Sequence, residues 1–488
     1  MDPQLAQSCC ASDVISGALA GYTRRMVSRD PLEAAILASR RHLASLPGIP
    51  VRPAGGGPEA ASLLPSELPA GPSDPAATVD QLEAVVSGGL LVTGSPPFFG
   101  WVVGGTLPVA LAADWMVSTW DSVGGVAAAG PALARLEDQA GRWLLELFGL
   151  PGSSSFGFTT GCQAAHVTAL AAARHELLRR RGVDVERSGL AGAPQLRVLA
   201  ADDRHVTVDL ALRYLGIGTD ALTTLPSDSQ GRVSPGAFAE ALAMGAGVPT
   251  IVVAQAGNIH TGAFEDLQAI CDVAHAAGAW VHVDGAFGLW ASASDSLRHL
   301  AAGVGDADSW ATDAHKVLNT PYDCGFVACA SASAHRAAMS GTGSYVAFDE
   351  SERDPNAWVL EYSRRARAIP VWAALRTLGR SGVAALVLGL HQRARQFADL
   401  LAEDPGVEIL NDVVFNQVLV RFGDSDSATQ EVIAAAQRDG VLWLGGSRWR
   451  DQVVARISVC NYATSPADIA RSAEALVSAW RGVSRGGA

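Results

Sequence analysis

WVHVDGAFGLWA, residues 280–291, and DADSWATDAHKVLNTPYDCG, residues 306–325, decide how this 488-residue chain is interpreted. The first stretch opens as an apolar run and ends in Asp284 followed by glycine. This pattern is typical of a buried parallel strand whose carboxyl end presents a functional side chain. The second stretch contains a short strand-like segment, residues 309–314, which is followed at once by His315 and Lys316.

Asp284 and Lys316 are the minimum that a pyridoxal phosphate (PLP) site requires. A lysine binds the aldehyde carbon of this cofactor covalently, and a carboxylate keeps the pyridine nitrogen protonated so that the ring accepts electrons. Taken singly, such residues are usually an ordinary strand-end aspartate and a surface lysine. Occurring together, they favour PLP as the cofactor.

Four segments of the chain carry a resemblance to a known family. They are VHVDGAFG (281–288), DAHKVLNTPYDCG (313–325), QAGNIHTGAF (255–264) and SRRARAIPVWAALRTLG (363–379). The chain resembles the PLP-dependent group II amino-acid decarboxylases, which include aromatic-L-amino-acid and glutamate decarboxylases, from about residue 45 to about residue 475.

The resemblance implies an α/β fold of fold-type I, the aspartate-aminotransferase-like class. Such a fold has a mostly parallel sheet with helices on both faces and a small C-terminal α+β domain. We expect an N-terminal helical arm over residues 1–90, a PLP-binding domain over 91–384 and the small domain over 385–488. The resemblance also implies a homodimer whose subunits share active sites.

Composition limits the partners and the compartment. The formal net charge of −13, with no basic block longer than residues 179–181, argues against nucleic acid or an anionic membrane as the main partner. Seven cysteines without a CxxC pair suggest neither a disulfide framework nor a zinc site. We therefore expect a soluble cytoplasmic protein without a metal, since no signal peptide or apolar run of about 18 residues is present.

Strand-like and helix-like segments alternate through the middle of the chain, which predicts a parallel sheet between helices. Helical spacing precedes them at residues 13–46 and 131–150, whereas the Pro- and Gly-rich residues 48–75 predict a loop. The expected strands are 196–201, 250–254, 280–284 and 325–330, and the expected helices between them are 206–214 and 266–277. The C-terminal part predicts helices at 388–401, 428–439 and 466–480, with strands at 415–422 and 453–460.

GSSSFGFTTGC, residues 152–162, is a glycine- and hydroxyl-rich turn that leads into a long helix. Free N–H groups at a helix N-terminus and small residues together bind phosphate, although a plain Ser/Thr cap gives the same pattern. The turn lies where the family has its phosphate loop. Thr160, Gly161 and Cys162 are therefore the expected phosphate contacts.

Three further cofactor contacts follow from the resemblance. His205 matches the family histidine that stacks on the pyridine ring, and Ala286 matches the small residue on the opposite face of the ring. His315 is expected to contact the phosphate or the reacting centre. His205 and Lys316 are candidate catalytic residues.

SPPFFGWVVGG, residues 95–105, resembles the family segment that lines the substrate pocket, although Ser95 replaces the usual histidine. Phe98, Phe99 and Trp101 are either core residues or pocket residues, and we take Phe99 and Trp101 as substrate contacts. His260 stands where typical aromatic decarboxylases carry threonine. It is either a substrate-specific group or a supporting residue.

Tyr345 and Arg456 complete the candidates. Tyr345 lies 29 residues after Lys316 in a small, polar and acidic segment, and a tyrosine near this distance protonates the intermediate in relatives. It is either that proton donor or a loop anchor. Arg456 resembles an arginine of a family motif and either binds a substrate carboxylate or has a structural role.

The sequence thus predicts α-decarboxylation of an L-amino acid with an apolar or aromatic side chain, to give the amine and CO2. The same residues also suit a PLP-dependent carbon–carbon lyase, such as an aldolase, or a decarboxylating aldehyde synthase. A non-catalytic homologue is a further alternative, and the intact Lys316, Asp284 and His205 argue against it.

Overall fold

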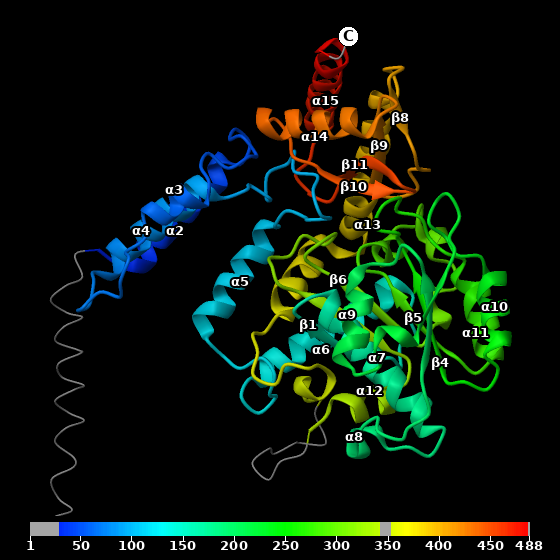
Figure 1. The fold of residues 1–488 in the computed structure, drawn as a ribbon. Coiled ribbons are helices and arrows are strands. Elements are labelled where there is room, and N and C mark those ends of the chain that lie inside the picture. The colour runs from blue at the N-terminus through cyan, green and yellow to red at the C-terminus, as the bar shows by residue number, and fades with distance from the viewer. Residues whose placement is uncertain (1–28, 342–352, 487–488) are drawn as a thin grey trace, which may run out of the picture. The chain divides into compact units, whose positions relative to one another are not determined.

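The computed structural model describes residues 29–341 and 353–486, and the chain forms two units, Met1–Val92 and Thr93–Ala488 (Figure 1). In the first unit α2 (Pro31–Ser45) packs against α4 (Pro75–Gly89). Each of these helices begins with an aspartate cap followed by proline, which satisfies a free N–H group and presets the backbone. The short helix α3 (Gly57–Ser62) lies inside the stretch predicted as a loop, so that prediction is wrong over six residues.

A seven-stranded sheet forms the centre of the second unit, in the order β1-β7-β6-β5-β4-β2-β3. Neighbouring strands from β6 to β3 run parallel, whereas β7 is antiparallel to both β6 and β1. The strands are β1 (Ser155–Thr159), β2 (Arg197–Ala201), β3 (Leu222–Leu225), β4 (Thr250–Gln255), β5 (Trp280–Asp284), β6 (Ser309–Asp313) and β7 (Gly325–Cys329).

The mostly parallel sheet confirms the predicted fold class, with one difference at β7. Only the segment 314–324 joins β6 to β7, and no crossover helix lies between the two strands. A parallel pair requires a crossover connection, so the chain returns antiparallel. This short return keeps the lysine segment pressed against the end of the sheet.

Helices cover both faces of this sheet, because its strands are apolar on both sides. One apolar cluster joins Val281 and Val283 of β5 to α6, α10, α11 and α13, while a second joins Trp280 to α7, α9 and α12. The helices are α5 (Pro108–Trp120), α6 (Pro131–Phe148), α7 (Cys162–Arg179), α8 (Val185–Ser188), α9 (Val206–Tyr214), α10 (Pro235–Met244), α11 (Leu267–Ala276) and α12 (Ala332–Met339); the 3-10 helices are η2 (Thr219–Ala221), η3 (Gly288–Ala293), η4 (Arg298–Ala301), η5 (Val304–Asp306) and η6 (Pro355–Trp358).

A second, antiparallel sheet lies towards the C-terminus, in the order β10-β11-β9-β8, and α14 and α15 pack beside it (Figure 1). Its elements are β8 (Val407–Ile409), β9 (Gln417–Phe422), α14 (Asp426–Asp439), β10 (Gly445–Trp449), β11 (Gln452–Ser458) and α15 (Pro466–Gly486). This arrangement matches the small α+β part that the resemblance implied.

The helix α13 (Ala368–Leu401) connects the two sheets and packs against α5, α6 and α15. Gly379 (φ 62°, ψ 178°) interrupts it, so two helical halves meet at a break. The predicted domain boundary at 384/385 falls inside this helix. By length and composition α13 could cross a membrane, but core helices pass the same test, and α13 packs against both layers of the unit.

Candidate active site

Asp284 is the last residue of β5, a central strand that pairs with β4 and β6. Its side chain is buried, and Oδ1 accepts a hydrogen bond of 3.2 Å from the backbone N–H of Ala286. Burial alone would raise the pKa of Asp284, but the nearby His166, His205 and Lys316 outweigh it, and the net pKa is lowered. Asp284 is therefore an ionised carboxylate at the carboxyl edge of the sheet.

Lys316 follows β6, the strand beside β5, and is the only lysine in the 488-residue sequence. Its Nζ lies 2.9 Å from Oδ2 of Asp313. Burial lowers the pKa of Lys316, but the carboxylate of Asp313 more than compensates, and the pKa lies above its usual value. In this state the lysine is a cation in an ion pair.

Asp313 also reaches the N-terminus of α7. Its Oδ1 accepts a hydrogen bond of 2.7 Å from the backbone N–H of Cys162, the first residue of the helix. An anionic oxygen at the free N–H groups of a helix is favourable, and here a carboxylate occupies that position. The N-terminus of α7 can therefore accept an anion beside the lysine.

Close packing shapes this anion-binding end. A Cβ on Gly325, the first residue of β7, would lie 2.5 Å from the carbonyl carbon of Gly161. Only glycine lets β7 and the start of α7 approach so closely. Gly161 and Cys162 thus lie beside Asp313 and His315, whereas the backbone N–H of Thr160 donates to Glu361 at 3.3 Å. The three residues stay predicted phosphate contacts.

His205 caps α9, and Nδ1 of its ring lies 2.7 Å from Oγ1 of Thr207. Burial lowers the pKa of His205, while the charge of Asp284 acts in the opposite direction. The ring is thus neutral and within electrostatic range of both Asp284 and Lys316. Ala286, two residues beyond Asp284, accepts a hydrogen bond from the backbone of Asp313 through its carbonyl oxygen.

His315 lies in the site between Lys316 and the chain that leads to β7. Its ring stacks on Tyr322 with ring centres 4.2 Å apart, and Nδ1 accepts a hydrogen bond of 3.2 Å from the backbone of Cys324. Nε2 lies 3.7 Å from Oδ1 of Asp313. Burial lowers the pKa of His315, so the ring is neutral.

His260 lies in the turn after β4, where β10 and β11 meet it. Its Nε2 is 2.9 Å from Oγ of Ser447, and its ring is 5.1 Å from that of Trp449. Burial, assisted by the charge of Arg456, lowers the pKa of His260 to about 4. Arg456 donates a hydrogen bond of 3.4 Å to the carbonyl oxygen of Ile259, so the small sheet supplies one wall around this turn.

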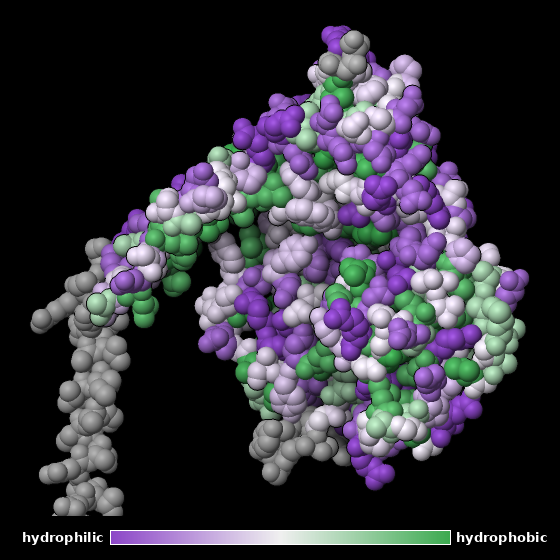
Figure 2. Space-filling model, in the orientation of Figure 1, coloured by the Kyte–Doolittle hydropathy of each residue, from purple (hydrophilic) through white to green (hydrophobic). Residues whose placement is uncertain are grey.

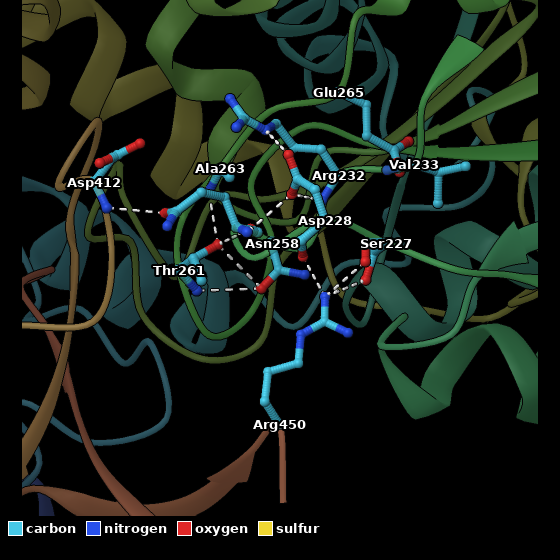
Figure 3. A network of polar contacts seen from close by, with 11 residues as sticks. Ser227, Asp228, Arg232, Val233, Asn258, Thr261, Ala263, Glu265, Asp412 and Arg450 are labelled. Atoms are coloured by element: carbon cyan, nitrogen blue, oxygen red, sulfur yellow. Dashed lines mark hydrogen bonds and ion pairs between the residues drawn. The ribbon is translucent and has the colours of Figure 1, made fainter. Parts of the chain in front are cut away.

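Asn258 shapes the turn that presents His260. Its Oδ1 accepts hydrogen bonds from the backbone N–H groups of His260 and Thr261, and its Nδ2 donates to Asp203. Figure 3 shows the contact of Asn258 with Thr261. Figure 3 also shows Arg450, on the hairpin between β10 and β11, donating to Ser227 and Asp228. The Asn-Ile-His departure from the family pattern is thus a self-supporting turn in this chain.

The aromatic segment passes directly along the lysine. A Cβ on Gly104 would lie 2.1 Å from the carbonyl oxygen of Lys316. Phe98 stacks on Trp443 and Phe99 contacts Phe397, and both phenylalanines are buried. Trp101 is 55% exposed and tilts against Trp443 at 4.4 Å. Phe99 therefore has the surroundings of a core residue, and Trp101 lies at the surface of this chain. Tyr345 lies outside the described residues.

Sequence reasoning gave no role to Asp313, His166 and His282, which belong to the site. His166 lies on α7 with its Nε2 3.6 Å from Oδ2 of Asp284, and its Nδ1 is 2.9 Å from Nε2 of His282. A signal was present, because His282 precedes Asp284 by two residues and so shares its face of the strand. A second signal was the absence of any lysine other than Lys316.

The residues present fit PLP. At one end of the sheet lie a helix end that accepts an anion, an ionised carboxylate and the sole lysine. Gly161 and Gly325 place no side chain there. Cys162, His166 and Asp284 also bring potential metal-ligand atoms within 4.8 Å of one another. Burial raises the pKa of the Cys162 thiol, however, which disfavours the thiolate that a metal requires.

Comparisons with known proteins identify the family. The pyridoxal-dependent decarboxylase conserved domain matches residues 58–422. Aromatic-L-amino-acid decarboxylase of Bos taurus is 26% identical over 82% of this chain and 85% of its own length. Tryptophan decarboxylase 1 of Oryza sativa subsp. japonica is 28% identical over 78% and 80%.

Solved structures share the fold. TDC of Oryza sativa, solved with PLP and tryptamine, superimposes with a TM-score of 0.86 at 24% identity over 99% of both chains. Mouse CSAD gives a TM-score of 0.84 at 22% identity over 92% of this chain and 98% of its own. The matched domain covers most of the sequence, so this chain belongs to the pyridoxal-dependent decarboxylase family and is a PLP-dependent carboxy-lyase that acts on an amino acid.

Proposed function

We propose that the enzyme decarboxylates an aromatic L-amino acid to the corresponding amine and CO2. The observation that carries this proposal is the tryptophan-rich surrounding of the site, in which Trp101, Trp443 and Trp449 lie on the segments next to Lys316 and His260. Aromatic rings bind one another favourably in such surroundings. The similarity to aromatic-L-amino-acid and tryptophan decarboxylases supports the same substrate class.

PLP supplies an electron-accepting ring that takes up the electron pair of the broken Cα–carboxylate bond. Lys316 would anchor the cofactor aldehyde, and its Nζ, once free, would hold a proton near Cα. Asp284, as an ionised carboxylate, would hold the proton on the ring nitrogen. The N–H groups at the start of α7, from Gly161 and Cys162, are proposed to bind the phosphate, with Thr160 and His315 beside them.

The neutral rings of His205 and His260 suit roles other than charge pairing. His205 is proposed to cover one face of the ring while Ala286 leaves room on the other. His260 is neutral above about pH 4 and is held by Ser447, so it is proposed to border the substrate side chain without demanding an acidic group. A neutral imidazole offers no charge to pair with a carboxylate on the substrate, so His260 itself favours an aromatic side chain.

Tyr345 remains a sequence-based proposal for the group that returns a proton to Cα. A phenol delivered there would compete with oxygen for the carbanion. If Tyr345 has this role, Tyr345→Phe should lower the ratio of amine to CO2, with aldehyde and hydrogen peroxide replacing the lost amine. An unchanged ratio would assign the proton to Lys316 or another acid.

We further propose that the protein is a cytoplasmic homodimer. The helix α5 exposes Trp115, Met116 and Trp120, at 39%, 51% and 47% exposure, which are costly to leave in water. Elsewhere on the face seen in Figure 2, hydrophilic and hydrophobic residues of the second unit are interspersed. A Trp115→Glu/Trp120→Glu variant should shift the molar mass measured by light scattering from dimer to monomer.

The substrate class is tested by incubating the PLP-loaded enzyme with separate L-amino acids. The panel contains tryptophan, tyrosine, phenylalanine, glutamate and 2,4-diaminobutyrate, and CO2, amine, aldehyde and peroxide are measured. We expect CO2 and amine in equal amounts from an aromatic substrate. Turnover of glutamate or diaminobutyrate alone would reject the proposed class, and aldehyde with peroxide would identify an aldehyde synthase instead.

A further inference from the structure

A row of buried polar side chains lies beside Asp284. Its members come from α7, β5 and β6. His166 of α7 contacts His282 of β5 (Nδ1 to Nε2, 2.9 Å), and His282 contacts Ser309 of β6 (Nδ1 to Oγ, 2.9 Å). Nε1 of Trp280 donates to the same hydroxyl at 2.9 Å. None of the four side chains is more than 2% exposed.

The carboxylate of Asp284 favours one direction of the hydrogen bonds in this row. A neutral His166 carries one ring proton, and a proton on Nε2 faces the anionic Oδ2 of Asp284, whereas a lone pair there would be repelled by it. Nδ1 of His166 then accepts from Nε2–H of His282, and Nδ1 of His282 accepts from the hydroxyl of Ser309. That hydroxyl in turn accepts from Nε1 of Trp280, since an indole N–H can only donate.

In this arrangement the single ring proton of His166 lies on Nε2. This nitrogen is buried and has no hydrogen-bond partner within residues 29–341 and 353–486, yet it lies 3.6 Å from Oδ2 of Asp284. A buried donor without a hydrogen-bond partner lowers the stability of the fold, so such a donor usually has a functional role. The other oxygen of Asp284, Oδ1, already accepts from Ala286.

Both histidines are neutral in this environment. Burial, together with the neighbouring His166, lowers the pKa of His282 to about 3. Burial also lowers the pKa of His166, although Asp284 and Asp313 act in the opposite direction. Neutral rings keep the row of donors and acceptors in one direction over the physiological range.

We propose that His166 is a positioning residue whose Nε2–H donates to Oδ2 of Asp284 in the PLP-loaded enzyme, while the row His282–Ser309–Trp280 supplies the donor that Nδ1 of His166 accepts from. The donated hydrogen bond holds the carboxylate in one orientation and stabilises its ionised form. An ionised, oriented Asp284 in turn keeps the ring nitrogen of the cofactor protonated. This inference rests on the role proposed above for Asp284.

The test uses enzyme reconstituted with PLP labelled with 15N in the ring, so that NMR reports directly whether the ring nitrogen is protonated. His166→Leu removes the donor, and His166→Gln retains an N–H donor. We expect the ring signal of His166→Leu to move towards the unprotonated form and kcat to fall about tenfold or more, as loss of a hydrogen bond to a charged group implies. His166→Gln should restore both in part.

His335 provides a matched control. It is also fully buried, its pKa is lowered to about 4, and its ring bonds to Ser155 and to the carbonyl oxygen of Trp358. His335→Leu should lower the unfolding temperature as His166→Leu does, but leave the ring nitrogen signal and the pH profile of kcat unchanged. The comparison separates positioning from general loss of packing.

Ser309→Ala provides a second route should His166→Leu fail to fold, because it removes one oxygen and no ring. Without the hydroxyl, His282 is free to reverse its tautomer, so the ring signal should become more unprotonated, by less than in His166→Leu. An unchanged ring signal in Ser309→Ala and in every foldable His166 variant would overturn the proposal. A protonated ring in Asp284→Asn would instead reject the role of Asp284 itself, whatever the substrate.

Discussion

Lys316 is the proposed attachment site of the cofactor, and the sequence contains no other lysine that could replace it. Borohydride reduction of the PLP-loaded protein should therefore fix one cofactor per chain, on the peptide that contains Lys316. Lys316→Ala should retain the fold, lose the fixed cofactor and lose decarboxylation. Mass spectrometry of the digested protein checks this result, and a cofactor fixed equally well in Lys316→Ala would contradict it.

Asp313 sets the protonation state of that lysine. The carboxylate lies 2.9 Å from Nζ and holds the pKa of Lys316 above its usual value despite burial, so the amine must release a proton before it attacks an aldehyde. Asp313→Asn removes the attraction, and the pKa should fall. In the variant a larger fraction of the amine is neutral at pH 7, and PLP should be captured faster.

The sole lysine makes this prediction directly measurable. A lysine-selective acylating reagent applied to the cofactor-free protein reports the neutral fraction of Lys316 as a function of pH, with the amino terminus as the one other amine. The midpoint of acylation should move to lower pH in Asp313→Asn. Asp323→Asn is the control, because it removes the carboxylate that pairs with Arg367 and leaves Asp313 unchanged. An equal midpoint in Asp313→Asn and the unchanged protein would refute the argument.

Residue types identified part of the site, and spatial contacts supplied the rest. Asp284 and Lys316 were predicted from strand ends and family motifs, and the structure brings both to adjacent strands. The contact of Asp313 with Cys162 joins residues 151 positions apart, so no local pattern encodes it. His166 lies on a helix whose burial on nearly every side hides any polar face.

Two elements with clear local signals were predicted to the residue, whereas elements with weak signals were missed. The bounds of β5 (Trp280–Asp284) and α9 (Val206–Tyr214) agree with the sequence, because an apolar run ending in aspartate and a capped helix are local signals. The helices α4 and α5 were missed. Their apolar residues lack a clear single face, and several of them stay exposed.

The contact between α7 and β7 is where an element's position controls the site. Gly325→Ala would place a Cβ 2.5 Å from the backbone of Gly161, and backbone cannot move aside as a side chain can. Overpacking of this kind costs about 1–3 kcal/mol. The displaced start of α7 should weaken PLP binding by about tenfold, a change that cofactor titration followed by absorbance can measure.

Gly152→Ala is the matched control for this variant, because a Cβ at Gly152 would meet nothing within 4 Å. It should leave both the unfolding temperature and the PLP affinity unchanged. Equal PLP affinity in Gly325→Ala and Gly152→Ala would mean that the helix end tolerates the shift, and the phosphate site would have to be sought elsewhere.

At the scale of the whole molecule, buried neutral histidines should make the fold sensitive to acid. Six of the eleven histidines have a lowered pKa, chiefly through burial, and for His260 and His335 it falls to about 4 and for His282 to about 3. In the unfolded chain each would titrate near pH 6.5. Between about pH 6.5 and pH 4 the unfolded state therefore binds more protons than the folded state.

The sign of the effect follows from that difference. When the unfolded state binds more protons, the free energy of unfolding rises with pH, so it must fall as pH drops from about 6.5 towards 4. Each such histidine contributes about 1.4 kcal/mol per pH unit within this window. Glu265 opposes the trend, because burial raises its pKa to about 8 and its contribution is lost as pH rises. Burial raises the pKa of Asp203 too, so this carboxyl acts in the same direction, but the histidines are more numerous.

Urea unfolding of the PLP-free protein at pH 7, 6 and 5 measures this dependence without cofactor release. The free energy of unfolding should decrease steeply below pH 6.5. The variant His335→Gln should show a shallower slope, by about one proton, because it removes one buried histidine that lies away from Asp284 and Lys316. A stability that is constant from pH 7 to pH 5 would show that these histidines bind protons in the folded state, and the fixed hydrogen-bond direction behind Asp284 would lose its physical basis.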